Sequence, residues 1–234
     1  MNIKQVDAGS AMTWLSEGWR LFKLNPGMWI ALIIVYLVVM IVLGIIPILG
    51  GLALALITPA LMTGMMHAAR ELDQGRDISI ETLFAPLTDA RKRGPMLTLG
   101  ALYIAVGVVL VILIFIMGGS ALIGGALMGG EAGAGMAAAG GMGLSLIIGL
   151  VAGFLIGMAF VYAGPLVMFQ EVPPVDAIKG SFSACLQNIV PFIVYGIVAV
   201  ILTFIAALPM FLGLLVVGPL LCAATYASYK AILE

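Results

Sequence analysis

Few residues in this sequence could carry chemistry. His67 is the single histidine, and Arg70 and Glu71 lie close to it in the sequence. A lone imidazole works as a general base or metal ligand only with positioned partners, so we favour an interfacial or capping role. Cys185 and Cys222 stand in apolar or amphipathic surroundings without metal-ligand spacing, which is typical of small buried hydrophobic residues. The sequence therefore predicts neither a metal site nor a cofactor site.

Motifs of catalysis and nucleotide binding are missing from the sequence. It contains no GxSxG, HExxH, P-loop or dinucleotide-binding pattern. Proton relays and ion paths in membranes depend on ionisable residues inside the bilayer, and the long apolar runs of this chain contain no Asp, Glu, Lys or Arg, with His67 only near the end of its run. We therefore expect no catalytic residues and a protein that is not an enzyme. The acidic residues Asp73, Asp77 and Glu81 are expected to be solvated.

The composition explains why charged chemistry is so sparse. Of the 234 residues, 63% are hydrophobic and 9% are charged, and the formal net charge is -1. Soluble domains carry about 25% charged residues, so this chain lacks the side chains for a water-facing surface. The charge balance also excludes a basic nucleic-acid-binding face, so no nucleic-acid partner is expected.

Six apolar runs are long enough to cross a bilayer as helices, for which about 20 residues are needed. They are Met28–Leu49, Gly50–Ala69, Pro95–Met117, Leu144–Phe169, Ile189–Pro209 and Phe211–Ser228. Backbone groups in lipid must be paired within the chain, and the runs do not alternate as barrel strands do. The predicted fold class is therefore all-α, a polytopic membrane protein of six transmembrane helices.

The basic residues indicate the orientation of these helices. All ten Lys and Arg residues lie before the first run, between the second and third, between the fourth and fifth, or after the sixth. Cytoplasmic loops carry an excess of Lys and Arg, so both termini are predicted to be cytoplasmic. The predicted location is the inner membrane, with multiple passes.

The runs also suggest an internal repeat. They pair into three hairpins, and the second run of each carries a proline: Pro59, Pro165 and Pro219. A short amphipathic segment precedes each pair, so we interpret the unit as an interfacial helix followed by a hairpin, present three times. The prolines are expected to be kinks or packing points. The alternative is that prolines are simply common in membrane helices.

This interpretation divides a single membrane domain, residues 1–234, into consecutive parts. They are a cytoplasmic amphipathic N-terminus (1–27), hairpin one (28–69), a cytoplasmic loop (70–94), hairpin two (95–169) with a glycine-rich periplasmic loop (118–142), a cytoplasmic interfacial helix (170–188), hairpin three (189–228) and the C-terminus (229–234).

The N-terminal segment is the best candidate for an interface. Helical spacing groups one apolar face from Met12, Leu15, Trp19 and Phe22. Indole rings suit headgroup depth and basic side chains can meet lipid phosphates, so the lipid or partner interface is assigned to Trp14, Trp19, Arg20 and Lys23. The alternative is a helix that only seats the bundle at the membrane surface.

Glycines suggest how the helices associate. Gly149, Gly153 and Gly157 are spaced by four residues in the fourth run, which predicts close contact with another helix backbone. That contact is expected within the monomer, with homodimer formation as the alternative. Residues 118–142 are rich in glycine and alanine, and a flexible linker, a lid and a docking strip all remain open.

Five segments stand out along the chain: the opening WLSEGWRLF, Asn25-Pro26, the turn IPILG, and the later SFSACLQN and YASY. In these segments the chain resembles an uncharacterised proteobacterial family of six-helix inner-membrane proteins. More distantly it is similar to the YciC-like envelope proteins and to the membrane domain of glycerophosphodiester phosphodiesterases, whose catalytic domain is missing here. The resemblance implies no established activity and no functional residues.

The function expected from these observations is non-enzymatic. We interpret the chain as an inner-membrane accessory protein that binds lipid or a partner membrane protein, in envelope maintenance or complex assembly. The alternative is a transporter or channel for a neutral or lipid-like solute, since absent charges argue against ion coupling but not against an apolar path. The expected partners are membrane lipids, with a membrane protein or a second copy of the chain as further possibilities.

Overall fold

The computed structural model describes the backbone of residues 3–234 and the side chains of residues 3–116, 143 and 145–234. This part of the chain forms nine helices: α1 (Ser10–Leu24), α2 (Pro26–Gly44), α3 (Leu49–Asp73), α4 (Ile80–Thr88), α5 (Ala90–Phe160), α6 (Ala163–Gln170), α7 (Pro174–Gln187), α8 (Ile189–Ala207) and α9 (Leu214–Leu233). The all-α fold class is confirmed.

Six stretches of the described residues are long and apolar enough to cross a membrane, as predicted. They are Pro26–Gly44, Leu49–Asp73, Ala90–Ile116, Ser145–Gln170, Ile189–Ala207 and Leu214–Leu233. Most of their residues are exposed or only partly buried, and such apolar surface suits a lipid environment better than water.

The bounds of the spans differ from the prediction at several ends. The first begins at Pro26, because the side chain of Asn25 accepts the N–H of Met28 and a proline is tolerated at the first helical position. It ends at Gly44, since the hairpin turn comes earlier and Ile48 has a positive φ of 61°. Helix α3 runs to Asp73 because backbone hydrogen bonding continues after the apolar run has ended.

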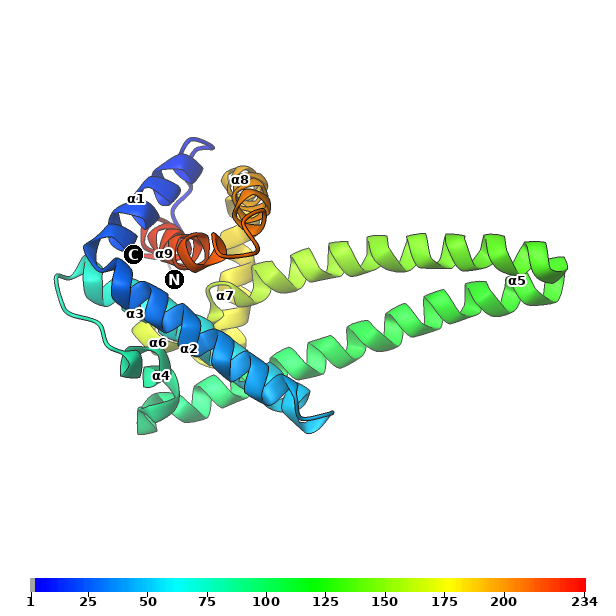
Figure 1. The fold of residues 1–234 in the computed structure, drawn as a ribbon, viewed down its shortest axis with the longest axis horizontal. Helices are drawn as coiled ribbons and strands as arrows, with labels where there is room; N and C mark the ends of the chain where they lie inside the picture. The colour runs from blue at the N-terminus through cyan, green and yellow to red at the C-terminus, as the bar shows by residue number, and fades with distance from the viewer. Residues whose placement is uncertain (1–2) are drawn as a thin grey trace.

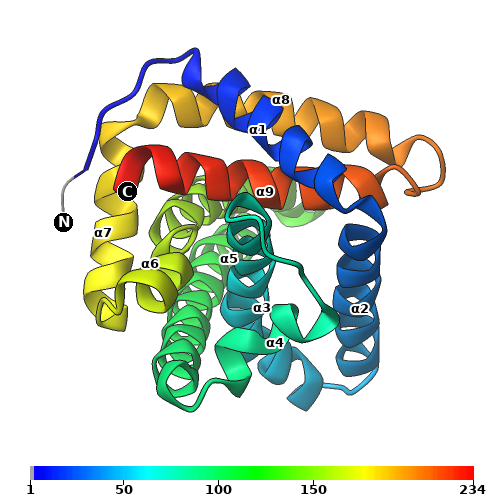
Figure 2. The same cartoon turned by 90° about the vertical axis from the view of Figure 1, so that its left-hand side faces the viewer.

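Three hairpins diverge from one end of the molecule, which carries both termini (Figures 1 and 2). They consist of α2 with α3, of the two arms of α5, and of α8 with α9. Figure 1 shows the ribbon of α5 running outward and returning, and Tyr103 and Phe160 bring its two arms together at 5.2 Å between ring centroids. The predicted glycine-rich loop, residues 118–142, lies outside the described side chains.

The end at which the hairpins meet holds most of the core. We call it the charged end, because ion pairs link α1, α3 and α9 there. Fully buried aromatic side chains at this end come from three helices (α1, α2 and α9) and the α5–α6 junction: Trp14, Trp29, Tyr162, Tyr226 and Tyr229. Helices α1, α4 and α7 lie here as well, each directly before a spanning helix. Their contact with a membrane surface, and the repeat itself, stay predictions.

Helix α1 lies across α9 (Figure 2). Its buried face consists of Ala11, Trp14, Leu15, Gly18, Leu21 and Phe22. A Cβ atom on Gly18 would stand 2.6 Å from the carbonyl oxygen of Leu220, so only glycine permits this crossing. The predicted apolar face is therefore corrected, since Met12 is 58% and Trp19 43% exposed.

The predicted close contact of the glycines in the second arm of α5 is not found among the described residues. A Cβ atom on Gly153 or Gly157 would meet nothing within 4 Å, and one on Gly149 would make only an ordinary contact, 3.8 Å from the Ile114 side chain. Close helix crossings lie elsewhere. A Cβ atom on Gly64 would clash with the backbone of Leu83 in α4.

Candidate functional site

The spanning stretch that ends at Gln170 is interrupted near Pro165. Helix α5 ends at Phe160 and α6 begins at Ala163, because the proline ring clashes with the carbonyl four residues earlier. The buried hydroxyl of Ser181 in α7 accepts the N–H of Tyr162 at 3.0 Å and donates to the carbonyl of Met158 at 2.7 Å. Pro165 thus lies at a local break, as predicted. Pro59 and Pro219 lie inside α3 and α9, where a kink stays a prediction.

This junction places Tyr162 at the centre of an aromatic layer across the charged end. Successive ring centroids lie 5.5–6.0 Å apart along the series Trp14, Phe192, Tyr162, Tyr229, Phe169 and His67. These rings come from α1, α8, the α5–α6 junction, α9, α6 and α3. Hydroxyl groups fix the layer further, since Tyr162 and Ser228 share a 2.6 Å hydrogen bond. We call these six rings the aromatic floor.

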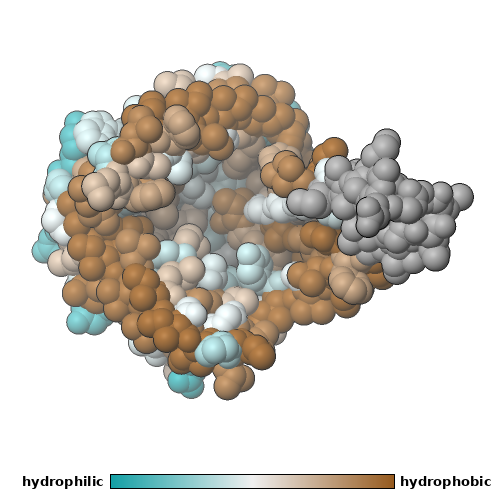
Figure 3. Space-filling view, turned by 45° about the vertical axis from the view of Figure 1, so that its right-hand side comes forward, coloured by the Kyte–Doolittle hydropathy of each residue, from teal (hydrophilic) through white to brown (hydrophobic). Residues whose placement is uncertain are grey.

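A cavity of about 460 Å³ borders this floor between the hairpins. Its lining comes from α3 (Thr58, Pro59, Met62, Met66), α5 (Tyr103, Phe154, Gly157, Met158, Phe160), the junction (Val161), α7 (Cys185), α8 (Phe192, Tyr195) and α9 (Cys222, Thr225). Figure 3 shows the molecule hollowed between its helices, with a hydrophobic rim and less hydrophobic residues inside. The size lies within the 300–1,000 Å³ range of ligand pockets.

Hydroxyl groups give the cavity a local polar region. Tyr195 and Thr225 donate to the carbonyl of Leu221 at 2.9 Å and 2.8 Å, and their oxygens lie 3.1 Å apart. Thr58 donates to the carbonyl of Leu54 at 2.6 Å. The lining contributed by the described residues contains no Asp, Glu, Lys, Arg or His side chain. The cavity is thus uncharged, with acceptor oxygens set in an apolar wall.

Both cysteines line the cavity, which the sequence alone did not indicate. Burial raises the pKa of the Cys185 thiol to about 12. The thiolate is the nucleophilic form, so Cys185 stays in its unreactive form at neutral pH. The prediction that Cys185 is a small buried hydrophobic residue is confirmed by its 1% exposure.

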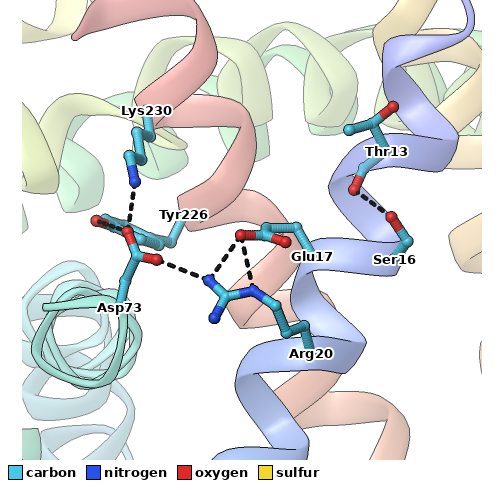
Figure 4. A network of polar contacts seen from close by, with 7 residues as sticks. All are labelled: Thr13, Ser16, Glu17, Arg20, Asp73, Tyr226 and Lys230. Carbon is cyan, nitrogen blue, oxygen red and sulfur yellow. Dashed lines mark hydrogen bonds and ion pairs between the residues drawn. The ribbon is translucent and has the colours of Figure 1, made fainter. Parts of the chain in front are cut away.

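A polar network joins three helices at the charged end (Figure 4). Asp73, at the end of α3, accepts from Arg20 of α1 at 2.7 Å and from Lys230 of α9 at 2.6 Å. The hydroxyl of Tyr226 donates to it at 3.3 Å. The side chain of Asp73 is only 10% exposed, so the expectation that it is solvated was wrong. It pairs because α1 and α9 converge on the end of α3.

The other charged groups at this end also form contacts between different helices. The Arg70 guanidinium lies 4.3 Å from the ring centroid of Phe169, a cation–π contact. Lys92 donates to Glu171 at 2.6 Å, and this hydrogen bond lowers the pKa of the Glu171 carboxyl. The His67 ring packs at a tilt against Phe169, and its Nδ1 has no hydrogen-bond partner among the described residues, with the Glu71 carboxylate 3.7 Å away. His67 is therefore better described as one of the floor rings than as a catalytic base.

The four predicted interface residues separate into two groups. Trp14 is 2% exposed and its ring packs against Phe192 and Tyr195, so it cannot contact lipid headgroups or a partner in this structure. Trp19 and Lys23 are exposed, and Trp19 stacks on Phe22 at 5.4 Å. Arg20 pairs with Glu17 and Asp73, and the hydrogen bond to Glu17 raises the pKa of its guanidinium. The assignment of Trp14 is corrected because α8 and α9 cover it.

Comparison with known proteins adds a relative. The chain is 30% identical over 238 aligned positions to the probable inner membrane protein BTH_II0599 of Burkholderia thailandensis, covering 97% of this chain and 84% of that protein. The chain belongs to the same family. No family model and no solved structure matches the chain. The more distant resemblance to YciC-like proteins and to phosphodiesterase membrane domains finds no support in these comparisons.

Proposed function

We propose that this chain is a non-enzymatic inner-membrane protein that holds a lipid molecule in the cavity between its hairpins. The observation that carries the proposal is the cavity itself: about 460 Å³, uncharged, and walled by spanning helices. The inner-membrane location is supported by the name of the Burkholderia relative. Both termini are proposed to be cytoplasmic, because the ion-paired network gathers basic residues from α1 and α9 at one end.

The chemistry of the lining supports binding over catalysis. General acid–base catalysis needs a titratable group positioned against the substrate, and the lining offers only hydroxyl and thiol groups. The Cys185 thiol is held protonated by burial. These features favour an accessory role, in which a bound lipid is held or presented rather than transformed.

The alternative, a transporter for a neutral solute, receives less support. A transport path must reach both sides of the membrane, and the aromatic floor separates the cavity from the charged end. Trp14, Tyr162 and Tyr229 in that floor are each at most 2% exposed. The described conformation therefore favours a binding chamber with one open side.

A matched pair of glycine substitutions tests lipid binding. Gly157 lines the cavity and Gly153 lies one helical turn earlier, and a Cβ atom at either position would meet nothing within 4 Å. Gly157→Leu places a bulky group at the cavity wall, whereas Gly153→Leu adds the same group at a position outside the lining. After purification in mild detergent, mass spectrometry of the extracted lipid should show a lipid retained at about one per chain. Retention should be lost in Gly157→Leu and kept in Gly153→Leu.

Two outcomes would contradict the proposal. Equal lipid retention by both variants would mean that the bound lipid lies on the outer surface. A protein copurifying with wild type and with Gly153→Leu, but not with Gly157→Leu, would assign the cavity to a partner membrane protein.

A further inference from the structure

Most hydroxyl groups that line the cavity already use their protons in hydrogen bonds within the protein, and this limits what they can bind in a ligand. A hydroxyl has one proton to donate and two lone pairs that accept. The protons of Tyr195 and Thr225 are used within the group formed with the Leu221 carbonyl, and the proton of Thr58 is used on the Leu54 carbonyl. These three oxygens therefore keep acceptor capacity but have no proton left for a ligand.

The Tyr195–Thr225 pair discriminates between lipid headgroups. A carboxylate or phosphate needs donors or cations; this pair has no free proton, and the described part of the lining contains neither Lys nor Arg, with the Tyr103 hydroxyl as its remaining neutral donor. A ligand carbonyl or ether offers only acceptor atoms, so it cannot form a hydrogen bond with the oxygens of Tyr195 and Thr225. A ligand hydroxyl, by contrast, can donate to the oxygen of Tyr195 or Thr225 while its chain lies along the apolar wall. The thiols of Cys185 and Cys222 are weak donors and do not reverse this preference.

We propose that the cavity binds an uncharged lipid with a free hydroxyl headgroup, such as a long-chain alcohol or a diacylglycerol, with that hydroxyl at the Tyr195–Thr225 pair. This inference rests on the proposed function, since it names the class of lipid that the cavity holds. The headgroup lies at the aromatic floor, where Phe192 belongs to both floor and cavity. The lipid chain points away from the charged end, along α3 and α5.

Three photoactivatable 16-carbon probes that differ only in the headgroup test this inference. They carry a primary alcohol, its methyl ether, or a carboxylate, which is ionised at pH 8. Purified protein should be labelled by the alcohol about fivefold more efficiently than by the ether, the effect of one hydrogen bond. The carboxylate should label least. Equal labelling by alcohol and ether, or strongest labelling by the carboxylate, would overturn the inference.

Hydroxyl deletions locate the headgroup. Thr225→Val or Tyr195→Phe should lower alcohol labelling toward the ether level. Thr203→Val is the matched control, because Thr203 also donates to the carbonyl four residues earlier, at 2.7 Å, but is exposed on α8 outside the cavity. Equal loss in Thr203→Val would refute the assigned position. The comparison of the three probes on wild type needs no variant and stands even where a variant fails to fold.

The same probes separate this inference from the proposed function. If Gly157→Leu abolishes labelling by all three probes and wild type does not discriminate among them, the cavity binds lipid and the headgroup assignment is wrong. If Gly157→Leu changes none of the labelling, the proposed function itself is wrong.

Discussion

Asp73 is the residue on which the charged end depends most. It is the one carboxylate that accepts from both α1 and α9 in the described part of the chain, through Arg20 and Lys230. Hydrogen bonds to charged groups contribute about 1.5–3 kcal/mol, and exposed ion pairs about 0–1 kcal/mol. The partners of Asp73 are half-exposed while Asp73 is mostly covered, so its contribution lies between these limits.

We therefore expect Asp73→Asn to destabilise the protein by about 1–2 kcal/mol, since two cations lose their shared carboxylate. The thermal unfolding midpoint in detergent measures this effect. Asp176→Asn is the control, because Asp176 and Lys179 are 3.9 Å apart and both are largely exposed. An equal effect of the two substitutions would show that Asp73 contributes no more than a surface pair.

At the level of single residues, the sequence predicted burial correctly where the local composition determines it. It failed where contacts with distant segments determine the environment of a residue. The burial of Cys185 followed from its apolar surroundings. Asp73 was placed in a solvated loop, because no local pattern reveals that α1 and α9 end beside it. Trp14 was assigned to a lipid or partner interface for the same reason, because the sequence around a tryptophan near a membrane surface does not reveal whether a headgroup or another helix of the same chain covers it.

At the scale of elements, the glycines that matter for packing are those at which two helices cross, and the GxxxG spacing alone does not identify them. The spacing of Gly149, Gly153 and Gly157 fits the pattern that small residues form at membrane-helix interfaces, yet their neighbours in the structure are distant or absent. Gly18 is part of no such row, whereas Gly64 is spaced by four residues from Ala60 and Ala68; both glycines permit close crossings, of α1 with α9 and of α3 with α4. A spacing indicates that a helix can be approached closely; only the fold decides which helix approaches.

Alanine substitutions separate these two kinds of glycine. In Gly64→Ala the new methyl group meets the Leu83 backbone, which cannot give way as a side chain can, so we expect a loss of about 1–3 kcal/mol of stability. In Gly153→Ala the methyl group enters open space and helix propensity improves, by up to about 1 kcal/mol. Thermal unfolding of the two variants should change in opposite directions. A destabilised Gly153→Ala would indicate a contact with a second chain.

For the whole molecule, the number of spans was accessible from the sequence because lipid imposes a simple length rule. The cavity could not be predicted from the sequence, because its lining comes from five helices and the α5–α6 junction. No single segment of the sequence indicates which other segments lie beside it. The break before Pro165 was expected from the proline ring. Its repair by Ser181, which comes from another helix, depended on the fold.

The orientation of the molecule remains a prediction, based on the ten basic residues. In a variant without Cys185 and Cys222, single cysteines introduced at Ser10 and Gln74 should resist an impermeant thiol reagent in whole cells. A cysteine at Gly130 should be labelled. After the outer face of the inner membrane and the cytoplasm are both made accessible, all three should react. Labelling at positions 10 or 74 in intact cells, without labelling at 130, would reverse the orientation.

The packing of α1 against α9 has a consequence for biosynthesis. The first helix of the chain depends for its burial on the last, and the N–H of Lys4 even donates to the carbonyl of Ile232. Roughly 190 residues separate the two helices, and at about 5–20 residues per second their synthesis takes about 10–40 s. Until α8 is made, Trp14 lacks its ring partners Phe192 and Tyr195, and until α9 is made, the rest of the buried face of α1 lacks the helix that covers it. A nascent chain that stops before α9 leaves the α9-facing side of α1 uncovered, so the packing of the first helix is completed only when α9 has been made.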